Sequence, residues 1–448
     1  MKIAVGARSA RMRDGLTALL LFLVAAAFRI MHLGSLKGFI FDEVYYAKDA
    51  HSLAQHGVEL TGKNLAEFIV HPPVGKWLIA IGIKIFGFNE FGWRISAAII
   101  GSLAIVLMYF VAQRLFNSYF LSLTASLFML FDGLELVQSR VALLDIFLMF
   151  FLLLTLFFLV RSQHWLAGIS LGLAAGVKWT GFYYFLAIFA FVIYVDYRRH
   201  RAMEEPHPIR KTVERDSALR ITQYLFLPGI TYVMSWSGWF LNSHGWDRSH
   251  SKGSFGVVTS FIKYHKEILN FHKNLTAHHP YQSNPWSWLI MGRPVSFYYQ
   301  SPSTCGAPKC SAAILGLGTP ILWWAMTIAL FVAFGYWIAR REWQSGLLLL
   351  LFAAGYLPWF LFQKRTMFNF YSIAFEPFLI LILVYVISKY LEGHPVKFGP
   401  LNESYRFYSV LAFIASVAIC FFYFFPLFVG ETIRYSDWFA RMWFSSWI

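Results

Sequence analysis

Long apolar runs separated by short polar segments recur along the whole chain. A helix needs about 20 apolar residues to cross a bilayer. The run at 166–177 is short, and the run at 77–88 is shorter still, as is typical of a re-entrant or interfacial helix. The pattern predicts an all-α polytopic membrane protein with about eleven transmembrane helices, near residues 15–31, 93–112, 119–136, 141–160, 166–177, 180–195, 221–241, 313–338, 347–362, 370–387 and 408–428.

The short connections with clustered basic residues set the expected orientation. They are the N-terminal segment before residue 15, residues 197–220 and the turn at Arg340-Arg341. Short basic loops stay on the cytoplasmic side, so these segments are predicted to be cytoplasmic. The first of them resembles a signal peptide but has no convincing cleavage site, which indicates an uncleaved first helix. The same topology places residues 34–92, residues 242–312 and the C-terminal tail on the extracytoplasmic side.

The second of these outer loops contains a further periodic segment. Between residues 254 and 275, apolar side chains recur at helical spacing, while Lys263, Lys266 and Lys273 fall mostly on the opposite side. This pattern predicts an amphipathic helix lying on the membrane. Residues 278–288, rich in proline and aromatic side chains, follow it. They fit either a folded loop over a site or an interfacial tryptophan anchor.

Composition agrees with a membrane protein. Hydrophobic residues make up 58% of the chain and charged residues only 14%, whereas about one quarter of a soluble domain is charged. The net charge of +15 is explained by basic cytoplasmic loops and contact with anionic lipid. No nucleic-acid-binding motif is present, so no nucleic-acid partner is expected.

The cysteines fall into two groups. Cys305 and Cys310 share a polar segment of the second outer loop, and Cys420 lies inside an apolar run. A metal site would require more ligands nearby, so an extracytoplasmic loop favours a disulfide between the first two. Cys420 is expected to be a small core residue.

Charged and polar residues gather at the predicted outer ends of the helices, where burial of charge is costly and commonly marks function. Cations could hold a phosphate that leaves, and a carboxylate could remove a proton from a hydroxyl. No P-loop, paired-histidine metal motif or Gly-x-Ser-x-Gly occurs, which leaves nucleotide, zinc and serine-nucleophile chemistry without support. Snorkelling or paired charges are the alternative for any single member of the set: Arg29, Asp42, Glu43, His71, Lys76, Arg94, Arg140, Asp145, Arg365 and Tyr371.

Four motifs, in this order along the chain, resemble those of the protein O-mannosyltransferases: Asp42-Glu43, His71-Pro72-Pro73-x-Gly75-Lys76, Ser139-Arg140-x4-Asp145 and Gly176-Val177-Lys178-Trp179-Thr180-Gly181. The segment from His279 to Trp288, together with Arg365-Thr366-Met367, resembles the bacterial, actinobacterial-type branch. The second outer loop has no room for the β-trefoil repeat domain of eukaryotic members.

This resemblance implies a GT-C-type membrane-embedded glycosyltransferase that forms a single domain over residues 1–448. The implied reaction transfers mannose, with inversion, from polyprenyl-phosphate mannose to Ser or Thr hydroxyls of secreted proteins, which the secretion machinery could hand over. The implied location is a bacterial plasma membrane, with the active site outside. The family has no firm requirement for a divalent metal, and no cofactor is implied besides the lipid-linked donor.

The resemblance also assigns roles to residues. Asp42 matches the catalytic aspartate, and Glu43 matches its acidic neighbour, which binds the acceptor or orders the loop. Because the two carboxylates are adjacent, Glu43 is the alternative catalytic base. His279, Tyr281 and Trp286 are assigned to the acceptor or to the loop that covers the site. The donor and its phosphate are assigned to Arg29, His71, Lys76, Arg94, Arg140, Asp145, Arg365 and Tyr371.

Two other functions remain open. A related transferase could move a sugar from a lipid phosphate to lipid A or to a cell-wall glycan, and only the acceptor separates it from a protein mannosyltransferase. A transporter is the alternative from another class. That function would be accompanied by internal repeats and charges near the middle of the bilayer, whereas here the charges cluster at the outer helix ends and no repeat is evident.

Overall fold

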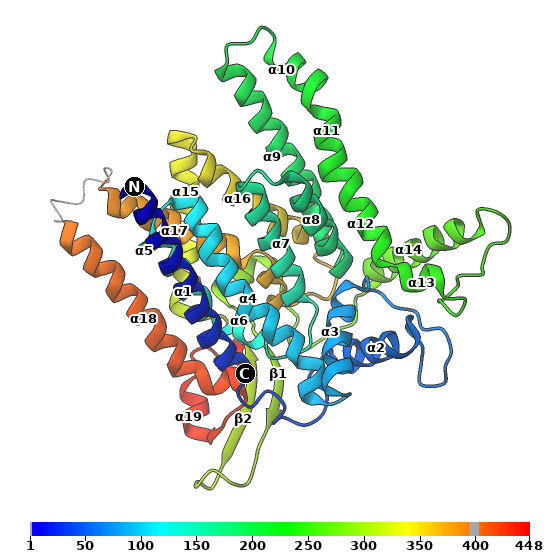
Figure 1. Cartoon of the computed structure of the whole chain (residues 1–448). Helices are drawn as coiled ribbons and strands as arrows, with labels where there is room; N and C mark the ends of the chain where they lie inside the picture. The colour runs from blue at the N-terminus through cyan, green and yellow to red at the C-terminus, as the bar shows by residue number, and fades with distance from the viewer. Residues whose placement is uncertain (1, 394–402) are drawn as a thin grey trace.

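The computed structural model describes residues 2–393 and 403–448, and most of these residues are helical. The first half of the chain contributes a series of helices that pack side by side (Figure 1). Their bounds are α1 Lys2–Ile30, α2 Glu43–His56, α3 Val74–Phe86, α4 Glu90–Phe116, α5 Tyr119–Leu130, α6 Gly133–Gln138, α7 Asp145–Val160, α8 His164–Val177 and α9 Gly181–Ala202.

The second half begins with a helical arm and then adds helices, short 3-10 turns and a small sheet. The arm is α10 Pro208–Lys211, η1 Thr212–Asp216, α11 Ser217–Ile221, η2 Thr222–Phe226, α12 Leu227–Ser235 and α13 Ser237–Leu241. The remaining elements are α14 Gly256–Asn274, η3 Pro285–Ile290, β1 Val295–Gln300, β2 Cys310–Gly316, α15 Pro320–Arg340, α16 Trp343–Tyr356, η4 Leu357–Phe362, η5 Asn369–Ala374, α17 Glu376–Glu392, α18 Glu403–Val429, β3 Thr432–Arg434, α19 Tyr435–Ala440 and η6 Ser445–Trp447.

Five helical segments of the described residues are long and apolar enough to cross a membrane. They are α4, α9, α15, the segment Trp343–Phe362 and α18. The apolar helices α5, α7 and α8 are shorter than this criterion requires. The polytopic membrane class is thereby supported, while the count of about eleven spans stays a prediction.

The expected span at 313–338 is wrong at its start. Its first residues belong to β2, which pairs antiparallel with β1 and with β3, and the helix begins only at Pro320. Every residue of β2 is buried. A fully buried strand is as continuously apolar as a membrane helix, so the pattern alone could not separate the two. Proline suits the first turn of a helix, where its missing N–H is not needed.

The expected span at 119–136 is also interrupted. Asp132 separates α5 from α6, and its carboxylate accepts hydrogen bonds from the backbone N–H groups of Leu134 and Glu135 at 2.8 and 3.1 Å. This is an N-cap, which starts a new helix instead of continuing the old one. The helix predicted at 254–275 agrees with α14, whose polar and apolar faces are distinct.

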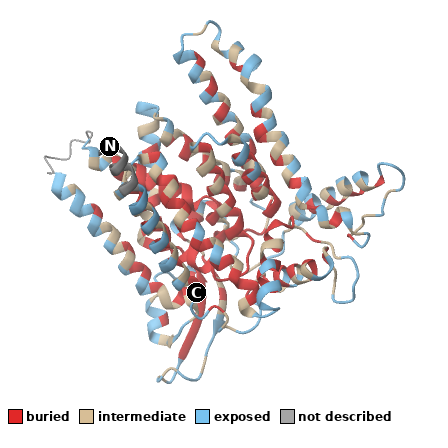
Figure 2. Ribbon diagram, viewed as in Figure 1, coloured by how far each residue is buried: buried red, intermediate tan, exposed pale blue. Residues whose placement is uncertain are grey.

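The bundle has two recognisable ends. Figure 1 shows the N-terminus and α10 toward one end, and α2, the β1–β2 hairpin and the C-terminus toward the other. Buried residues concentrate in the middle of the bundle, and exposed ones line the outward faces of α18 and of the helices from α9 to α12 (Figure 2). The end that carries α2 also carries the Asp42-Glu43 and His71-to-Lys76 motifs identified from the sequence.

Candidate active site

A cavity of about 110 Å³ lies where α7, α14 and η5 meet the turn between α8 and α9. Its walls combine cations, a carboxylate, imidazoles and aromatic rings. Four of the residues predicted from the sequence line it: His71, Asp145, Arg365 and Tyr371. The other polar and aromatic side chains of its lining are Lys178, Trp179, Thr180, Tyr183, His272, Lys273, Trp359 and Phe362.

Lys178 is held inside the cavity by a carboxylate. It follows α8 in an extended conformation, and its Nζ donates to Asp145 Oδ2 at 2.8 Å. Asp145 is the first residue of α7, where the positive end of the helix dipole favours a negative charge. The ammonium also lies 5.0 Å from the centre of the Tyr371 ring. This arrangement keeps a cation in a buried position with a face left for an anionic ligand.

Besides Lys178 and the exposed Lys273, the cavity lining contains the cation Arg365. Its Nη2 donates to His272 Nδ1 at 3.3 Å, and His272 Nε2 donates to the carbonyl of Val70 at 2.9 Å. Burial, reinforced by the Arg365 charge, lowers the pKa of His272 to about 4, so this imidazole is neutral. Within the described part of the chain Arg365 forms no ion pair, and its buried Nε has no acceptor.

His71 is a neutral neighbour of this pair. Its ring lies 5.3 Å from that of His272 and 6.0 Å from that of Tyr46. Burial lowers the pKa of His71 well below its ordinary value, and the charge of Lys178 lowers it further. At neutral pH the imidazole can therefore accept or donate a hydrogen bond without adding charge.

Asp42 lies beside the cavity without lining it. The residue precedes α2, and burial raises the pKa of its carboxyl to about 6. The Lys178 charge opposes this rise and the Asp145 charge adds to it, so all three groups share one electrostatic neighbourhood. No described residue forms an ion pair with Asp42. A carboxylate with these properties can take a proton near neutral pH.

The residue before Asp42 has an unusual backbone conformation. Phe41 has a φ of +51°, which is uncommon for a bulky side chain. Its ring is held edge-on by three other aromatic rings, with centroids at 5.1 to 5.8 Å, from Phe297, Phe368 and Phe370. These contacts compensate the strained conformation and fix the direction in which the chain presents Asp42.

Glu43 occupies a different environment from its neighbour. It is fully buried, and its two oxygens accept from Arg94 Nε and Nη2, both at 2.8 Å. The same carboxylate accepts from the backbone N–H of Ile40 and Ala142 at 2.8 and 2.9 Å. Its acceptor sites are occupied, so it holds the loop to α4 and to the segment before α7.

We expect Glu43→Ala to lower the stability of the protein by about 3–5 kcal/mol, because it leaves the Arg94 guanidinium buried without its partner. Thermal unfolding of the purified protein in detergent measures this change. The control is Lys37→Ala, which removes an exposed cation 3.6 Å from Glu90 and should cost less than about 1 kcal/mol. Equal stability of Glu43→Ala and the parent protein would contradict the anchoring role.

The other predicted cations lie outside the cavity lining and have partners of their own. Arg29 forms a buried ion pair with Glu135. Arg140 Nη1 donates to the carbonyls of Phe28, Arg29 and Met31 at 2.8 to 2.9 Å, which caps the C-terminal end of α1. Lys76 Nζ lies 2.5 Å from Glu59 and 3.5 Å from Asp49. Their contacts, like that of Arg94, fasten helix ends and the segment around α2.

The predicted acceptor residues lie next to the cavity. The His279 ring lies 5.0 Å from that of Phe368 and 6.0 Å from that of Phe41. Tyr281 packs under the Arg293 guanidinium at 5.0 Å. Trp286 is exposed and lines a second cavity of about 490 Å³, which shares Arg365 with the first. The two cavities therefore meet at one cation.

Cys305 and Cys310 form a disulfide at the tip of the β1–β2 hairpin, with Cα atoms 5.9 Å apart. Cys420 is a free, buried thiol in α18. Over the described ranges 2–393 and 403–448, no group of three or more His, Cys, Asp or Glu side chains could hold a metal ion.

The sequence analysis gave no role to several cavity residues, among them Lys178, His272 and Trp359. Lys178 was part of a motif, and its position directly after an apolar run was the available signal. His272 lay on the predicted amphipathic helix without any distinguishing feature. Trp359, over which Arg365 packs at 5.7 Å, lay inside a predicted span. Their contribution depends on helices that meet only in the folded chain.

The fold matches solved membrane glycosyltransferases. The S. cerevisiae protein O-mannosyltransferase Pmt1–Pmt2 complex bound to the sugar donor aligns with a TM-score of 0.80 at 15% identity, over 97% of this chain and 93% of that one. ArnT from Cupriavidus metallidurans bound to undecaprenyl phosphate aligns with a TM-score of 0.54 at 16% identity, over 95% and 77%. The fold is thus that of the membrane-embedded, GT-C-type glycosyltransferases, as predicted.

Sequence comparison narrows this class. Residues 70–212 match the family model "dolichyl-phosphate-mannose-protein mannosyltransferase", and residues 257–447 match "C-terminal four TMM region of protein-O-mannosyltransferase". A polyprenol-phosphate-mannose–protein mannosyltransferase of Mycolicibacterium smegmatis is 31% identical over 95% of this chain and 91% of its own length. That of Corynebacterium glutamicum is 30% identical over 91% and 88%. The chain belongs to the protein O-mannosyltransferase family, which confirms the resemblance seen in the motifs.

Proposed function

We propose that this protein transfers mannose from polyprenyl-phosphate mannose to Ser or Thr hydroxyls of exported proteins, with inversion at the anomeric carbon. The observation that carries the proposal is the juxtaposition of Asp42, whose pKa is raised to about 6, with a cavity that contains Lys178 and Arg365. The relatives that match nearly the whole chain are named for the same donor and for protein acceptors.

The proposed step is a single displacement. Asp42 accepts the proton of the acceptor hydroxyl, and the hydroxyl oxygen forms a bond to the anomeric carbon of mannose. The bond from that carbon to the phosphate oxygen breaks, and polyprenyl phosphate leaves with the electron pair. Lys178 and Arg365 stabilise the negative charge that develops on the phosphate. The neutral imidazoles of His71 and His272 supply hydrogen bonds in the same cavity.

The remaining predicted residues are assigned positioning roles. Glu43 and Arg94 hold the backbone that presents Asp42, as their mutual hydrogen bonds support. Arg29, Arg140 and Lys76 hold the neighbouring helix ends through their ion pair, carbonyl and carboxylate contacts. These three residues therefore position the helices around the donor, whereas the sequence motifs implied that they contact the donor directly.

The second cavity is proposed to admit the acceptor. Its lining combines the exposed Trp286 with Arg293 and other residues of the loop at 276–293, and it joins the catalytic cavity at Arg365. Tyr281 and His279 hold this wall through Arg293 and Phe368. Such a half-polar, aromatic surface suits an extended peptide segment, which the loop at residues 242–312 would cover on one side.

The proposed setting is a bacterial plasma membrane with the site on its extracytoplasmic face. The basic segments at 197–220 and 340–341 would then be cytoplasmic, and the loops 34–92 and 242–312 would be outside. The whole chain, 1–448, would act as a single catalytic domain. Transfer onto proteins emerging from the secretion machinery fits this orientation.

The test is transfer of radiolabelled mannose from polyprenyl-phosphate mannose to a Ser/Thr-rich peptide by the purified protein. We expect acid-stable, β-eliminable label on the peptide. Label that appears only when lipid A or a cell-wall glycan replaces the peptide would instead support the alternative acceptor. In sealed right-side-out vesicles, a peptide added outside should be labelled. Labelling confined to inverted vesicles would contradict the proposed orientation.

A further inference from the structure

A larger cavity, of about 1380 Å³, lies at the other end of the bundle. Its walls come from the last residues of α7, the second half of α9, α11 and the turn between α15 and α16. The helix α7 joins the two cavities, because Asp145 at its start lines the catalytic one and Val160 at its end lines this one. A helix rises about 1.5 Å per residue, so the two are separated by about 22 Å.

Most of the wall of this larger cavity is apolar. Its volume exceeds the range of about 300–1,000 Å³ that is usual for sites of drug-sized ligands. Trp337 and Trp343 line the cavity, and tryptophan is enriched at membrane–water interfaces. Several apolar side chains around it are also partly exposed, as expected of a surface that meets lipid. The apolar and aromatic lining comprises Leu159, Val160, Phe191, Val192, Val195, Trp337, Trp343, Leu347 and Leu350.

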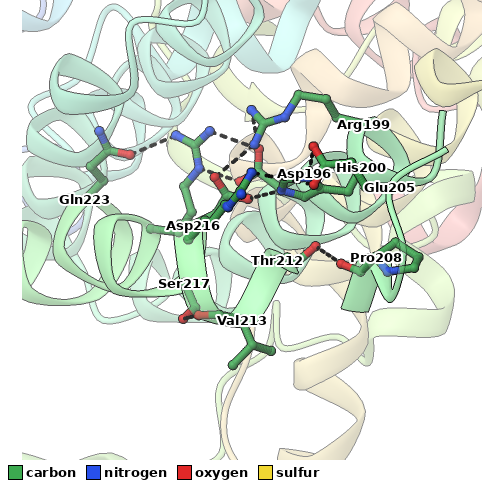
Figure 3. Close-up of polar contacts among 12 residues, drawn as sticks. Asp196, Arg199, His200, Glu205, Pro208, Thr212, Val213, Asp216, Ser217 and Gln223 are labelled. Atoms are coloured by element: carbon green, nitrogen blue, oxygen red, sulfur yellow. Dashed lines mark hydrogen bonds and ion pairs between the residues drawn. The ribbon is translucent and has the colours of Figure 1, made fainter. Parts of the chain in front are cut away.

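Two of the four arginines in this cavity are neutralised within the protein. Arg220 donates to both oxygens of Asp196 at 2.7 and 3.1 Å, and Arg199 contacts Asp196 at 3.2 Å and Asp216 at 2.8 Å. Figure 3 shows this network, in which His200 also meets Asp216, at 2.7 Å. It holds the segment from α10 to α11 against the end of α9.

The other two arginines lack a carboxylate partner among the residues that the structure describes. Arg198 donates to the hydroxyl of Tyr194 at 2.9 Å, and the Arg341 guanidinium lies 4.7 Å from the Trp337 ring centre. The remaining carboxylate of the lining, Glu342, is taken by Lys389 at 3.0 Å and by the hydroxyl of Tyr385 at 2.9 Å. The cavity thus combines apolar walls with two available guanidinium groups.

We infer that this cavity binds an anionic phospholipid of the leaflet opposite the active site. Its phosphate would be contacted by Arg198 and Arg341, and its acyl chains would lie along the apolar wall between α9 and α16. Guanidinium groups suit phosphate because they donate two parallel hydrogen bonds. Basic pockets between membrane helices bind anionic headgroups by this chemistry. The inference rests on the proposed function only in one respect: the proposed orientation would make this leaflet the cytoplasmic one.

The apolar wall favours a lipid over a free anion. A soluble phosphate would satisfy the two arginines but would leave the large apolar surface in contact with water, which is unfavourable. A zwitterionic lipid would satisfy the wall but would bring a positive group toward two cations. The combination therefore selects for a lipid with net negative charge.

The experiment is native mass spectrometry of the delipidated protein in mild detergent. Phosphatidylglycerol and phosphatidylcholine with identical acyl chains are titrated in parallel. We expect preferential retention of phosphatidylglycerol. The double variant Arg198→Gln/Arg341→Gln should weaken that retention by about tenfold or more and should leave phosphatidylcholine binding unchanged. Equal affinities for the two lipids in the parent protein would overturn the inference.

The matched control is Arg11→Gln/Arg161→Gln. These arginines carry the same charge at the same end of the bundle, are exposed and do not line the cavity. They should leave phosphatidylglycerol retention unchanged, and an equal loss would reveal general surface attraction instead. Displacement of the lipid by millimolar inorganic phosphate would assign the arginines to a soluble anion. Unfolding temperatures without lipid, and binding of polyprenyl phosphate, should match the parent in both variants and so exclude misfolding.

Discussion

Replacing Asp42 by Asn should lower mannosyl transfer by about 10²–10⁴-fold, since the amide keeps the size of the side chain but cannot accept the proton. The protein should still fold and bind polyprenyl phosphate, because Asp42 forms no ion pair with any described residue. Turnover and donor binding, measured on the same purified preparation, give the two readouts. Near-normal turnover of Asp42→Asn would end its assignment as the base.

The pH profile gives an independent readout of the same group. Because burial raises the pKa of Asp42 to about 6, its carboxylate is protonated below that pH and cannot act as a base. We therefore expect kcat/KM of the parent protein to fall about tenfold per pH unit below about 6 and to level off above it. The residual activity of Asp42→Asn should lack this dependence.

Asp49 supplies a matched control. It lies on the same helix, α2, and burial raises the pKa of its carboxyl to about 6 as well. It lies 3.5 Å from Lys76 and does not line the catalytic cavity. Asp49→Asn should retain turnover within a few-fold and keep the acid limb of the profile. Loss of the acid limb in Asp49→Asn would show that Asp49, and not Asp42, is the group whose protonation lowers kcat/KM.

The sequence predicted which polar residues share one end of the molecule because topology is encoded locally. The topology predicted from the apolar runs and the short basic loops placed Asp42, His71, Asp145 and Arg365 on one face. The structure brings these residues together around one cavity. The family followed from ordered motifs. These inferences use neighbouring residues and need no knowledge of which helix packs against which.

Pairing between distant segments could not be predicted in the same way. Arg29 has its carboxylate partner in Glu135, and Glu43 has its partner in Arg94, but nothing near either residue identifies the other. A cation that is free to bind phosphate and one that is already neutralised are therefore identical in sequence. The structure shows which cations line the cavity, and it adds Lys178, which pairs with Asp145 and whose motif had been recognised without a role.

Replacing Lys178 by Gln should lower turnover by about 10²–10³-fold, which is typical for loss of one group that stabilises developing negative charge. The phosphate carries more charge as it leaves than in the bound donor, so the change should appear mainly in kcat. Arg365→Gln should weaken the affinity for polyprenyl phosphate as well, because Arg365 has no ion-pair partner among the described residues and offers a buried, unpaired Nε. Lys364→Gln is the control for donor affinity, which it should leave unchanged, since that neighbouring cation is exposed and lines the second cavity but not the catalytic one.

Lys178 also needs a control for its contact with Asp145. The single variant leaves the Asp145 carboxylate buried without the ammonium 2.8 Å away, so part of its effect could arise from lost stability. In the double variant Asp145→Asn/Lys178→Gln both charges are absent, and the unfolding temperature should recover toward that of the parent. Turnover should not recover, because the phosphate still lacks its cation. Recovery of both quantities in the double variant would show that Lys178 serves only to neutralise Asp145, and catalysis would then have to rely on Arg365 alone.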